Sequence, residues 1–163
     1  MRRARLLILL ISVVLFSSCN KPSSYRCVGY LKIRNVTEFT IFLESNIESY
    51  DFPYFDKEVR AGGFSYVAGT RLFNTVVENV DDLRIEDFVV NYEDAKVSAY
   101  FENENGEREL IYTWTYASRN DDSMKQLFNL DGSELTFGQD NIDRRHLYST
   151  YSFYIADDML HRY

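Results

Sequence analysis

KVSAYFENENGERELIYTWT, from Lys96 to Thr115, is the stretch that decides the fold. It holds two runs of alternating apolar and polar residues, separated by Asn105-Gly106. An Asn-Gly pair is the strongest short-range signal for a β-hairpin, because a type I′ turn requires positive φ at both central positions. A two-residue loop there predicts three cross-strand pairs: Phe101 with Leu110, Ala99 with Tyr112, and Val97 with Trp114. These six side chains would share one apolar face, which favours Trp114 as a core residue over a ligand platform.

The same register gathers glutamates at the hairpin tip, where Glu102 would face Glu109 and Glu104 would face Glu107. Like charges directly across a strand pair are destabilising, by about 0.2–1 kcal/mol per pair. The tip is then either a solvated end that disfavours edge-to-edge association, or a cation site, since calcium prefers carboxylate oxygens. The chain has no twelve-residue calcium loop with glycine at its required place, which favours the solvated tip.

Alternation predicts further strands on both sides of the hairpin. Leu31 and Ile33 alternate with charged residues, and a second strand is predicted over 39–45. Pairing Ile33 with Ile41 and Leu31 with Leu43 would put four apolar side chains on one face. Shorter strands are predicted over 58–61, 64–73, 126–130 and 134–137, and spacing predicts one short helix over 83–90.

These elements predict an all-β domain. Tyrosine and phenylalanine are abundant, with 13 and 12 residues, and aromatic side chains favour the pleated, half-buried surface of strands. We expect about seven to nine strands in an immunoglobulin-like, two-sheet antiparallel β-sandwich with one short helix. A small β-barrel is the alternative, because evenly spaced strands fit both architectures.

The last predicted strand, over 145–155, carries a candidate ligand face. Alternation separates an apolar set, Leu147, Tyr151, Phe153 and Ile155, from a polar set, His146, Tyr148, Thr150, Ser152 and Tyr154. Tyrosine rings beside hydroxyl groups can stack on sugar rings or anchor a protein partner. Large rings are seldom left uncovered, so a second sheet or loop over this face is the alternative.

The first residues of the chain predict where it works. Three arginines precede an apolar run over 6–16, and Ser17-Ser18-Cys19 follows, which is the layout of a secretory signal. The run is shorter than the roughly 20 residues that span a bilayer. The segment from Leu15 to Cys19 resembles a bacterial lipobox, in which the cysteine is acylated after cleavage, although Phe16 stands where leucine is usual.

We therefore expect a lipoprotein signal peptide over 1–18, a lipidated Cys19 with a short tether over 19–25, and a single domain over 26–163. An ordinary secretory signal and a retained anchor are the alternatives. With Cys19 lipidated, Cys27 is expected to be a small buried apolar side chain; without lipidation the two cysteines could pair.

Charge and motifs exclude several classes of function. The chain carries 18 Lys+Arg against 25 Asp+Glu, and removal of the three signal arginines leaves 15 against 25. Such acidity argues against nucleic-acid partners, and membrane contact is expected only through the lipid. The two histidines have no metal-ligand spacing, and no nucleophile elbow, phosphate-binding glycine loop or dinucleotide fingerprint occurs. We expect no cofactor, no metal and no catalytic residues.

Three segments resemble the small lipoproteins of Bacteroides-type bacteria that are built as immunoglobulin-like sandwiches. They are the signal ending at Cys19, the strand–turn–strand over 31–43, and the close of the chain over 151–160, although Ala156 stands where such endings often carry a hydroxyl residue. The resemblance implies an outer-membrane lipoprotein. Acidic residues after the cysteine often mark surface-exposed members, and their absence over 20–24 favours the periplasmic side.

The function expected from these observations is that of a non-catalytic envelope lipoprotein, a binding or interaction module on a lipid tether. A glycan or an envelope protein is the expected ligand. The alternative is a small periplasmic hydrolase or an enzyme-inhibitor-like domain whose residues meet only in three dimensions.

Overall fold

The computed structural model describes residues 24–51, 55–70, 75–78, 82–103, 105–121, 125–139 and 146–160. Its elements are mainly strands, joined by turns of 3-10 helix. In chain order they are β1 (Tyr25–Asn35), β2 (Ile41–Ser45), β3 (Glu58–Val59), β4 (Phe64–Gly69), β5 (Thr75–Val77), η2 (Ile85–Asp87), η3 (Tyr92–Asp94), β6 (Lys96–Glu102), β7 (Arg108–Thr115), η4 (Leu130–Gly132), β8 (Glu134–Gln139), β9 (His146–Ile155) and η5 (Asp157–Met159).

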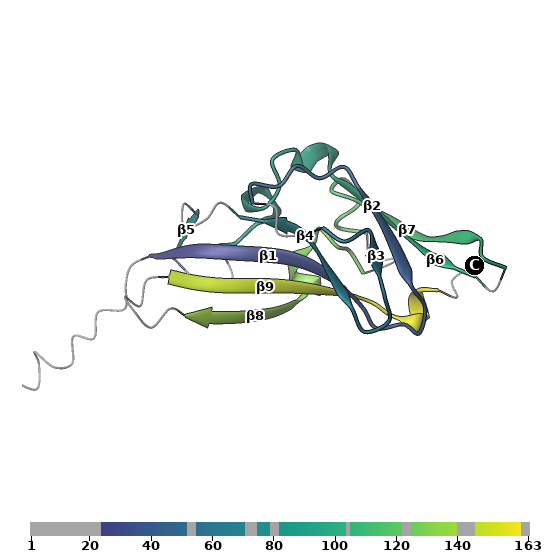
Figure 1. Cartoon of the computed structure of the whole chain (residues 1–163). Helices are drawn as coiled ribbons and strands as arrows, with labels where there is room; N and C mark the ends of the chain where they lie inside the picture. Colours follow the sequence, from purple (N-terminus) through teal and green to yellow (C-terminus); the bar gives the residue numbers. More distant parts are fainter. Residues whose placement is uncertain are drawn as a thin grey trace, which may run out of the picture.

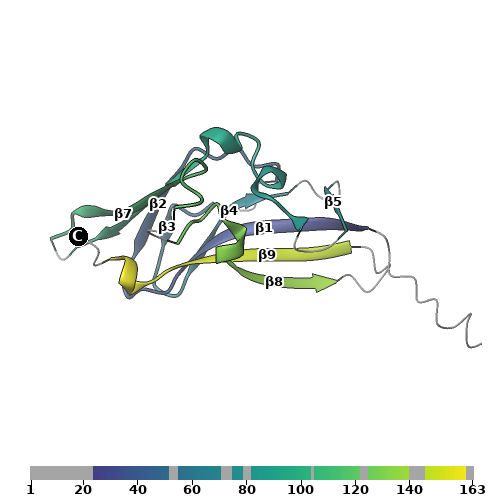
Figure 2. The same cartoon turned by 180° about the vertical axis from the view of Figure 1, so that it is seen from behind.

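Within these residues the strands form two sheets, which confirms the predicted β-sandwich. Sheet A has the order β4-β1-β9-β8, with β5 also paired to β1, and sheet B has the order β3-β2-β6-β7. The two sheets do not close into one barrel. Figures 1 and 2 show sheet B and the teal turns η2 and η3 on the same side of sheet A.

The centre of sheet A is the pair formed by the first and last strands, β1 and β9, which run parallel to each other. Ten consecutive positions are in register, from Arg26 beside His146 to Asn35 beside Ile155. Every other named strand pair is antiparallel. In a strand, successive side chains point to opposite faces. The odd-numbered residues of both strands are buried against sheet B and the 3-10 turns: Cys27, Leu31, Ile33, Leu147, Tyr151, Phe153 and Ile155.

The predicted pairing of Ile33 with Ile41 and of Leu31 with Leu43 is wrong, because β1 belongs to sheet A and β2 to sheet B. The chain crosses between the sheets after Asn35, whose buried carboxamide holds the corner. Its Nδ2 donates to the carbonyl oxygens of Phe39 at 2.7 Å and Val59 at 2.9 Å. Its Oδ1 accepts from the Thr37 amide at 3.0 Å. The four apolar side chains are nevertheless all buried, facing one another across the sandwich rather than along one sheet.

The hairpin prediction is confirmed at the base and wrong at the tip. The predicted pairs of Val97 with Trp114 and Ala99 with Tyr112 both form. Beyond them the register moves by one residue, and the pairs are Tyr100 with Leu110, Phe101 with Glu109, and Glu102 with Arg108. The shift places an arginine opposite Glu102 and so removes the predicted like-charge pair with Glu109.

Two compensating irregularities explain the shift. The Asn103 amide donates to the Glu107 carbonyl at 2.9 Å, so three residues separate the strands instead of two, with Gly106 at a φ of 77°. The Asn103 side chain accepts from the amides of Asn105 and Glu107, which stabilises this wider loop. Ile111 then forms a bulge that restores the register, and it is buried while Leu110 is exposed.

The segment over 83–90 forms the single 3-10 turn η2 instead of a longer helix, and the part of the chain that the structure describes contains no α-helix. The cause is competition for the backbone groups. The Val90 amide donates to the Glu48 carbonyl at 2.7 Å, and the Tyr50 amide donates to the Phe88 carbonyl at 3.3 Å. These bonds join the segment to the chain after β2, so the Val90 amide and the Phe88 carbonyl are taken up outside a helix.

The core has two halves. Between the sheets, the fully buried Trp114 ring lies edge-to-face on Phe153 with centroids 5.2 Å apart, and its Nε1 donates to the Lys125 carbonyl at 3.0 Å. Trp114 is therefore a core residue, as predicted. Where sheet B does not cover sheet A, the ring of Phe88 packs on Tyr151 with centroids 5.8 Å apart.

Gly29 is required beneath Phe88, because a Cβ atom there would lie 2.9 Å from Phe88 Cε1 and 3.1 Å from Ser149 Oγ. We expect Gly29→Ala to lower the free energy of unfolding by about 1–3 kcal/mol, the usual effect of overpacking a filled core. Urea unfolding measures the change, with Val76→Ala at an exposed position of β5 as the control, expected within about 0.5 kcal/mol of wild type.

A second substitution tests whether the contact with Phe88 causes the loss of stability in Gly29→Ala. In the Gly29→Ala background, Phe88→Leu should be less destabilising than it is alone, because the smaller side chain relieves the contact. A Gly29→Ala variant as stable as wild type would show that Phe88 moves aside freely and would contradict this account of the core.

Candidate functional site

The outer face of sheet A carries the predicted ligand face. Even-numbered residues of β9 point away from the core, and Tyr148 is 43% exposed. Thr150 and Tyr154 are half-buried, whereas Ser152 is buried and contributes little accessible surface. His146 begins β9 beside Arg26, and its side chain lies outside the described part of the structure.

Register brings further aromatic and cationic side chains onto this face from β1 and β4. Tyr30 lies beside Thr150, Lys32 beside Ser152 and Arg34 beside Tyr154, while β4 adds Phe64 and Tyr66 on the far side of β1. We call Tyr30, Lys32, Arg34, Phe64, Tyr66, Tyr148 and Tyr154 the aromatic face.

Ring contacts fix the arrangement of the aromatic face. Tyr66 lies edge-to-face between Tyr30 and Phe64, with centroid distances of 5.5 and 5.4 Å. Lys32 Nζ lies 5.3 Å from the Phe64 centroid, and the Arg34 guanidinium carbon lies 5.9 Å from that of Tyr154. Cations at such distances are attracted to the ring faces. The face is therefore a packed layer of rings and cations on a rigid sheet.

The Tyr30 hydroxyl group is half-buried in this layer. Burial raises its pKa, and the nearby Asp51 carboxylate and the Tyr66 and Tyr148 hydroxyl groups raise it further. The Tyr30 hydroxyl thus stays protonated at neutral pH and can donate a hydrogen bond.

Sequence reasoning found the β9 part of this face but missed the residues from β1 and β4: Tyr30, Lys32, Arg34, Phe64 and Tyr66. Their alternation was visible, since Tyr30 continues the even-numbered set of Lys32 and Arg34. No local pattern predicts that β1 lies between β4 and β9. This strand order brings the side chains of the three strands together on one face.

The predicted carboxylate cluster at the hairpin tip is only partly within the described structure, because Glu104 lies outside it. Glu102 pairs with Arg108, and Glu109 Oε1 accepts from Asn103 Nδ2 at 2.6 Å. Glu107 is exposed. Among the described residues no group of three or more His, Cys, Asp or Glu side chains could hold a metal ion. A cation site that includes Glu104 stays a prediction.

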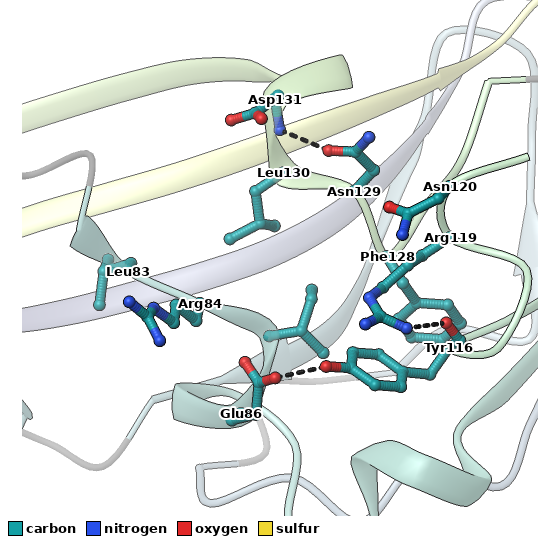
Figure 3. Close-up of a pocket in the computed structure, with 11 residues that line it drawn as sticks. Leu83, Arg84, Glu86, Tyr116, Arg119, Asn120, Phe128, Asn129, Leu130 and Asp131 are labelled. Atoms are coloured by element: carbon teal, nitrogen blue, oxygen red, sulfur yellow. Dashed lines mark hydrogen bonds between the residues drawn. The ribbon is translucent and has the colours of Figure 1, made fainter. Parts of the chain in front are cut away.

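A hollow of about 190 Å³ lies among the loops that cover the inner side of sheet A, formed by residues near η2, after β7 and around η4 (Figure 3). Its lining is apolar at Leu83, Ile85, Phe128 and Leu130, and polar at Arg84, Glu86, Arg119, Asn120, Asn129 and Asp131. We call it the loop hollow. Typical ligand pockets hold about 300–1,000 Å³, so it is small.

One wall of the loop hollow is Tyr116, which is held on both sides. Its hydroxyl donates to Glu86 Oε1 at 2.5 Å, and the Arg119 guanidinium carbon lies 3.8 Å from its ring centroid (Figure 3). Arg119 also donates to the Tyr116 carbonyl at 2.9 Å. The bond to Glu86 ties the segment after β7 to η2 across the hollow.

The two cysteines differ in what the structure describes. Cys27 is a buried free thiol whose Sγ lies 3.5 Å from Ser149 Oγ, and burial raises its pKa. Cys19, the predicted lipidation residue, lies outside the described residues. Within those residues no helix is both long enough and apolar enough to cross a bilayer.

Comparison of the chain with protein-family models, with curated proteins and with solved structures gives no match.

The bond between Tyr116 and Glu86 predicts a pH dependence. The hydrogen bond to Glu86 is the largest cause that raises the pKa of Tyr116 above its ordinary 10.0, followed by burial and the Glu86 charge, with Arg119 opposing them. Because the folded pKa is the higher one, the stabilisation is complete below pH 10 and is lost as pH rises through the folded pKa. We expect the stability difference between wild type and Tyr116→Phe to shrink over that range.

Chemical unfolding at several pH values between about 8 and 11 measures the difference. In Glu86→Gln the acceptor is neutral, so the difference should begin to shrink at lower pH. A gap between wild type and Tyr116→Phe that stays constant across the range would contradict the assigned bond.

Proposed function

We propose that the chain is a lipid-anchored protein of the bacterial outer membrane whose sandwich binds a ligand, without transforming it, through the aromatic face. The single observation that carries the proposal is the packed layer of tyrosines, Phe64, Lys32 and Arg34 on one rigid sheet. Tyrosine and arginine are the side chains that contribute most at recognition surfaces, since they combine a large apolar area with a polar tip.

A glycan is the ligand that this chemistry supports best. Rings offer apolar faces to the C–H groups of sugars, while the hydroxyl groups of Tyr30 and Thr150 and the two cations offer hydrogen bonds. The half-buried rings lose little side-chain freedom on binding, because neighbouring rings already restrict them. An envelope protein with an acidic, apolar patch would use the same contacts.

The proposed anchor is compatible with exposure of this face. β1 begins at Tyr25, a few residues after Cys19, and Figure 1 shows its start at the opposite end of the domain from the β6–β7 hairpin. The eleven residues of β1 extend about 35 Å at roughly 3.3 Å per residue. An anchor at Cys19 would therefore leave most of the aromatic face beyond the headgroups. The absence of acidic residues over 20–24 favours the periplasmic leaflet.

Ligand binding is tested on a glycan array with the full chain in detergent. The variant Tyr148→Ala, Tyr154→Ala should lose about tenfold or more in affinity for any glycan that wild type binds, since each ring removed from a binding surface is worth about 1 kcal/mol or more. Tyr100→Ala is the matched control, because Tyr100 lies in sheet B with its hydroxyl on Glu44. Binding by the double variant equal to that of wild type would exclude the aromatic face as the site.

The anchor is tested separately with Cys19→Ser. Wild type should fractionate with membranes and give a mature N-terminal fragment that begins at residue 19 and carries acyl chains by mass spectrometry. Cys19→Ser should lack the acyl mass and leave the membrane fraction. A Cys19→Ser protein that remains in the membranes, or a wild-type fragment without acyl chains, would refute lipidation while leaving the glycan result unaffected.

A further inference from the structure

The outer face of sheet A is basic although the chain is acidic. Register places three basic residues of β1 on this face, Arg26, Lys32 and Arg34, each beside an outward position of β9. Among the strands that the structure describes, β8 adds one carboxylate to the same face, Glu134, across β9 from Lys32, and Asp51 borders the face at the end of β4. The whole chain carries 25 Asp+Glu against 18 Lys+Arg, so its basic residues are concentrated here.

The outer face of sheet B shows the opposite balance. Cross-strand pairs place Glu44, Glu58 and Glu102 on it, together with Lys96 and Arg108. The basic excess is therefore a property of one face of the domain and not of the strands in general. Charge of one sign gathered on one face attracts ligands of the opposite sign and orients them as they approach.

The three basic residues form a line along β1. At roughly 3.3 Å per residue, Lys32 and Arg34 lie about 7 Å apart along the strand, and Arg26 lies about 26 Å from Arg34. A small anion could contact one or two of these side chains at a time. A chain molecule with acidic groups repeated along its length can contact all three, so the spacing favours a polymer.

Lys32 and Arg34 lie among the rings that would contact the sugars. Lys32 Nζ is 5.3 Å from the Phe64 centroid, and the Arg34 guanidinium carbon is 5.9 Å from that of Tyr154. Both basic side chains are half-buried, so their charges are less screened by water than those of fully exposed side chains. The Tyr154 ring attracts the Arg34 guanidinium without using its N–H groups, and the planar fork of these groups matches a carboxylate or a sulfate.

We propose that the ligand of the aromatic face is an acidic polysaccharide, with its sugar rings on the tyrosines and its carboxylate or sulfate groups on Lys32 and Arg34. Arg26 extends the contact toward the start of β1. This inference rests on the proposed function and specifies its ligand. A nucleic-acid duplex carries about one negative charge per 1.7 Å, far denser than the cations of this face, and an acidic chain repels it. An acidic polysaccharide spaces its charges more widely.

The test measures the affinity of the full chain in detergent for polysaccharides matched in backbone, by biolayer interferometry. One pair is polygalacturonate and its fully methyl-esterified form, and the other is dextran sulfate and dextran. We expect the charged member of at least one pair to bind at least about tenfold more tightly than its neutral counterpart, and we expect salt to weaken that binding. A preference confined to the first pair identifies carboxylated sugars as the ligand, and one confined to the second pair identifies sulfated sugars.

Substitutions test whether the preference comes from the aromatic face. Lys32→Gln, Arg34→Gln should weaken binding of the charged polysaccharide by about tenfold or more, because two charge-assisted contacts are lost. Lys32→Arg, Arg34→Lys keeps both charges and should bind more tightly than the glutamine variant. Lys96→Gln, Arg108→Gln removes one lysine and one arginine from sheet B and should leave the affinity unchanged.

The outcomes distinguish this inference from the proposed function. Equal binding of charged and neutral polysaccharides that is lost in Tyr148→Ala, Tyr154→Ala would keep the aromatic face as a glycan site and overturn the acidic ligand. Charge-dependent binding that survives Tyr148→Ala, Tyr154→Ala but not Lys32→Gln, Arg34→Gln would support the acidic ligand and contradict the ring contacts. The inference is also overturned if none of the four polymers binds, if the sheet A and sheet B glutamine variants lose affinity equally, or if single-stranded DNA binds more tightly than both charged polysaccharides.

Discussion

The parallel ladder between β1 and β9 is the constraint on which the rest of the structure depends. Its ten registered positions join the two ends of the domain and divide their side chains between core and surface. A slip of one residue would turn the buried odd-numbered set outward and bury the even-numbered Tyr30, Tyr148 and Tyr154. Because the paired residues are about 120 positions apart in sequence, the ladder closes a long loop, which is the kind of contact that slows folding.

The unequal size of the two sheets explains why the loop hollow exists. β1 and β9 have eleven and ten residues, whereas β2 has five, so sheet B covers only part of the inner side of sheet A. Where sheet B covers sheet A, the Trp114 ring packs against Phe153 of β9 and fills the space between the sheets. The remainder is closed by loops, with Phe88 over Gly29 and Tyr151. Loops pack less regularly than a second sheet, and a cavity with a polar rim is the result.

Local pattern predicted which face of a strand is buried, and it could not predict which strand lies beside it. Alternation identified Trp114 as core and divided β9 into its two faces, because the period of two is a property of one strand. The predicted partner strand of β1 was wrong. Adjacency in sequence favoured β2, and no local pattern encodes the crossover between sheets that Asn35 stabilises. At the hairpin tip, Asn-Gly indicated the turn correctly, but the Asn103 side chain favoured a loop one residue wider.

The candidate sites were likewise predictable only where they depend on the pattern of a single strand. Two residues of the aromatic face, Tyr148 and Tyr154, were visible in β9, and the other five join them only through the order β4-β1-β9 within the sheet. The loop hollow was not predictable, because it joins Arg84, Tyr116 and Asp131 from three segments with no shared periodicity. Sheet and loops are also suited to different ligands. A ladder of fixed rings presents a broad surface to an extended ligand, whereas a rim of short loops encloses a small one. Which side chains share a surface is therefore set by the order of strands in a sheet, and where a hollow forms is set by the loops that complete the core.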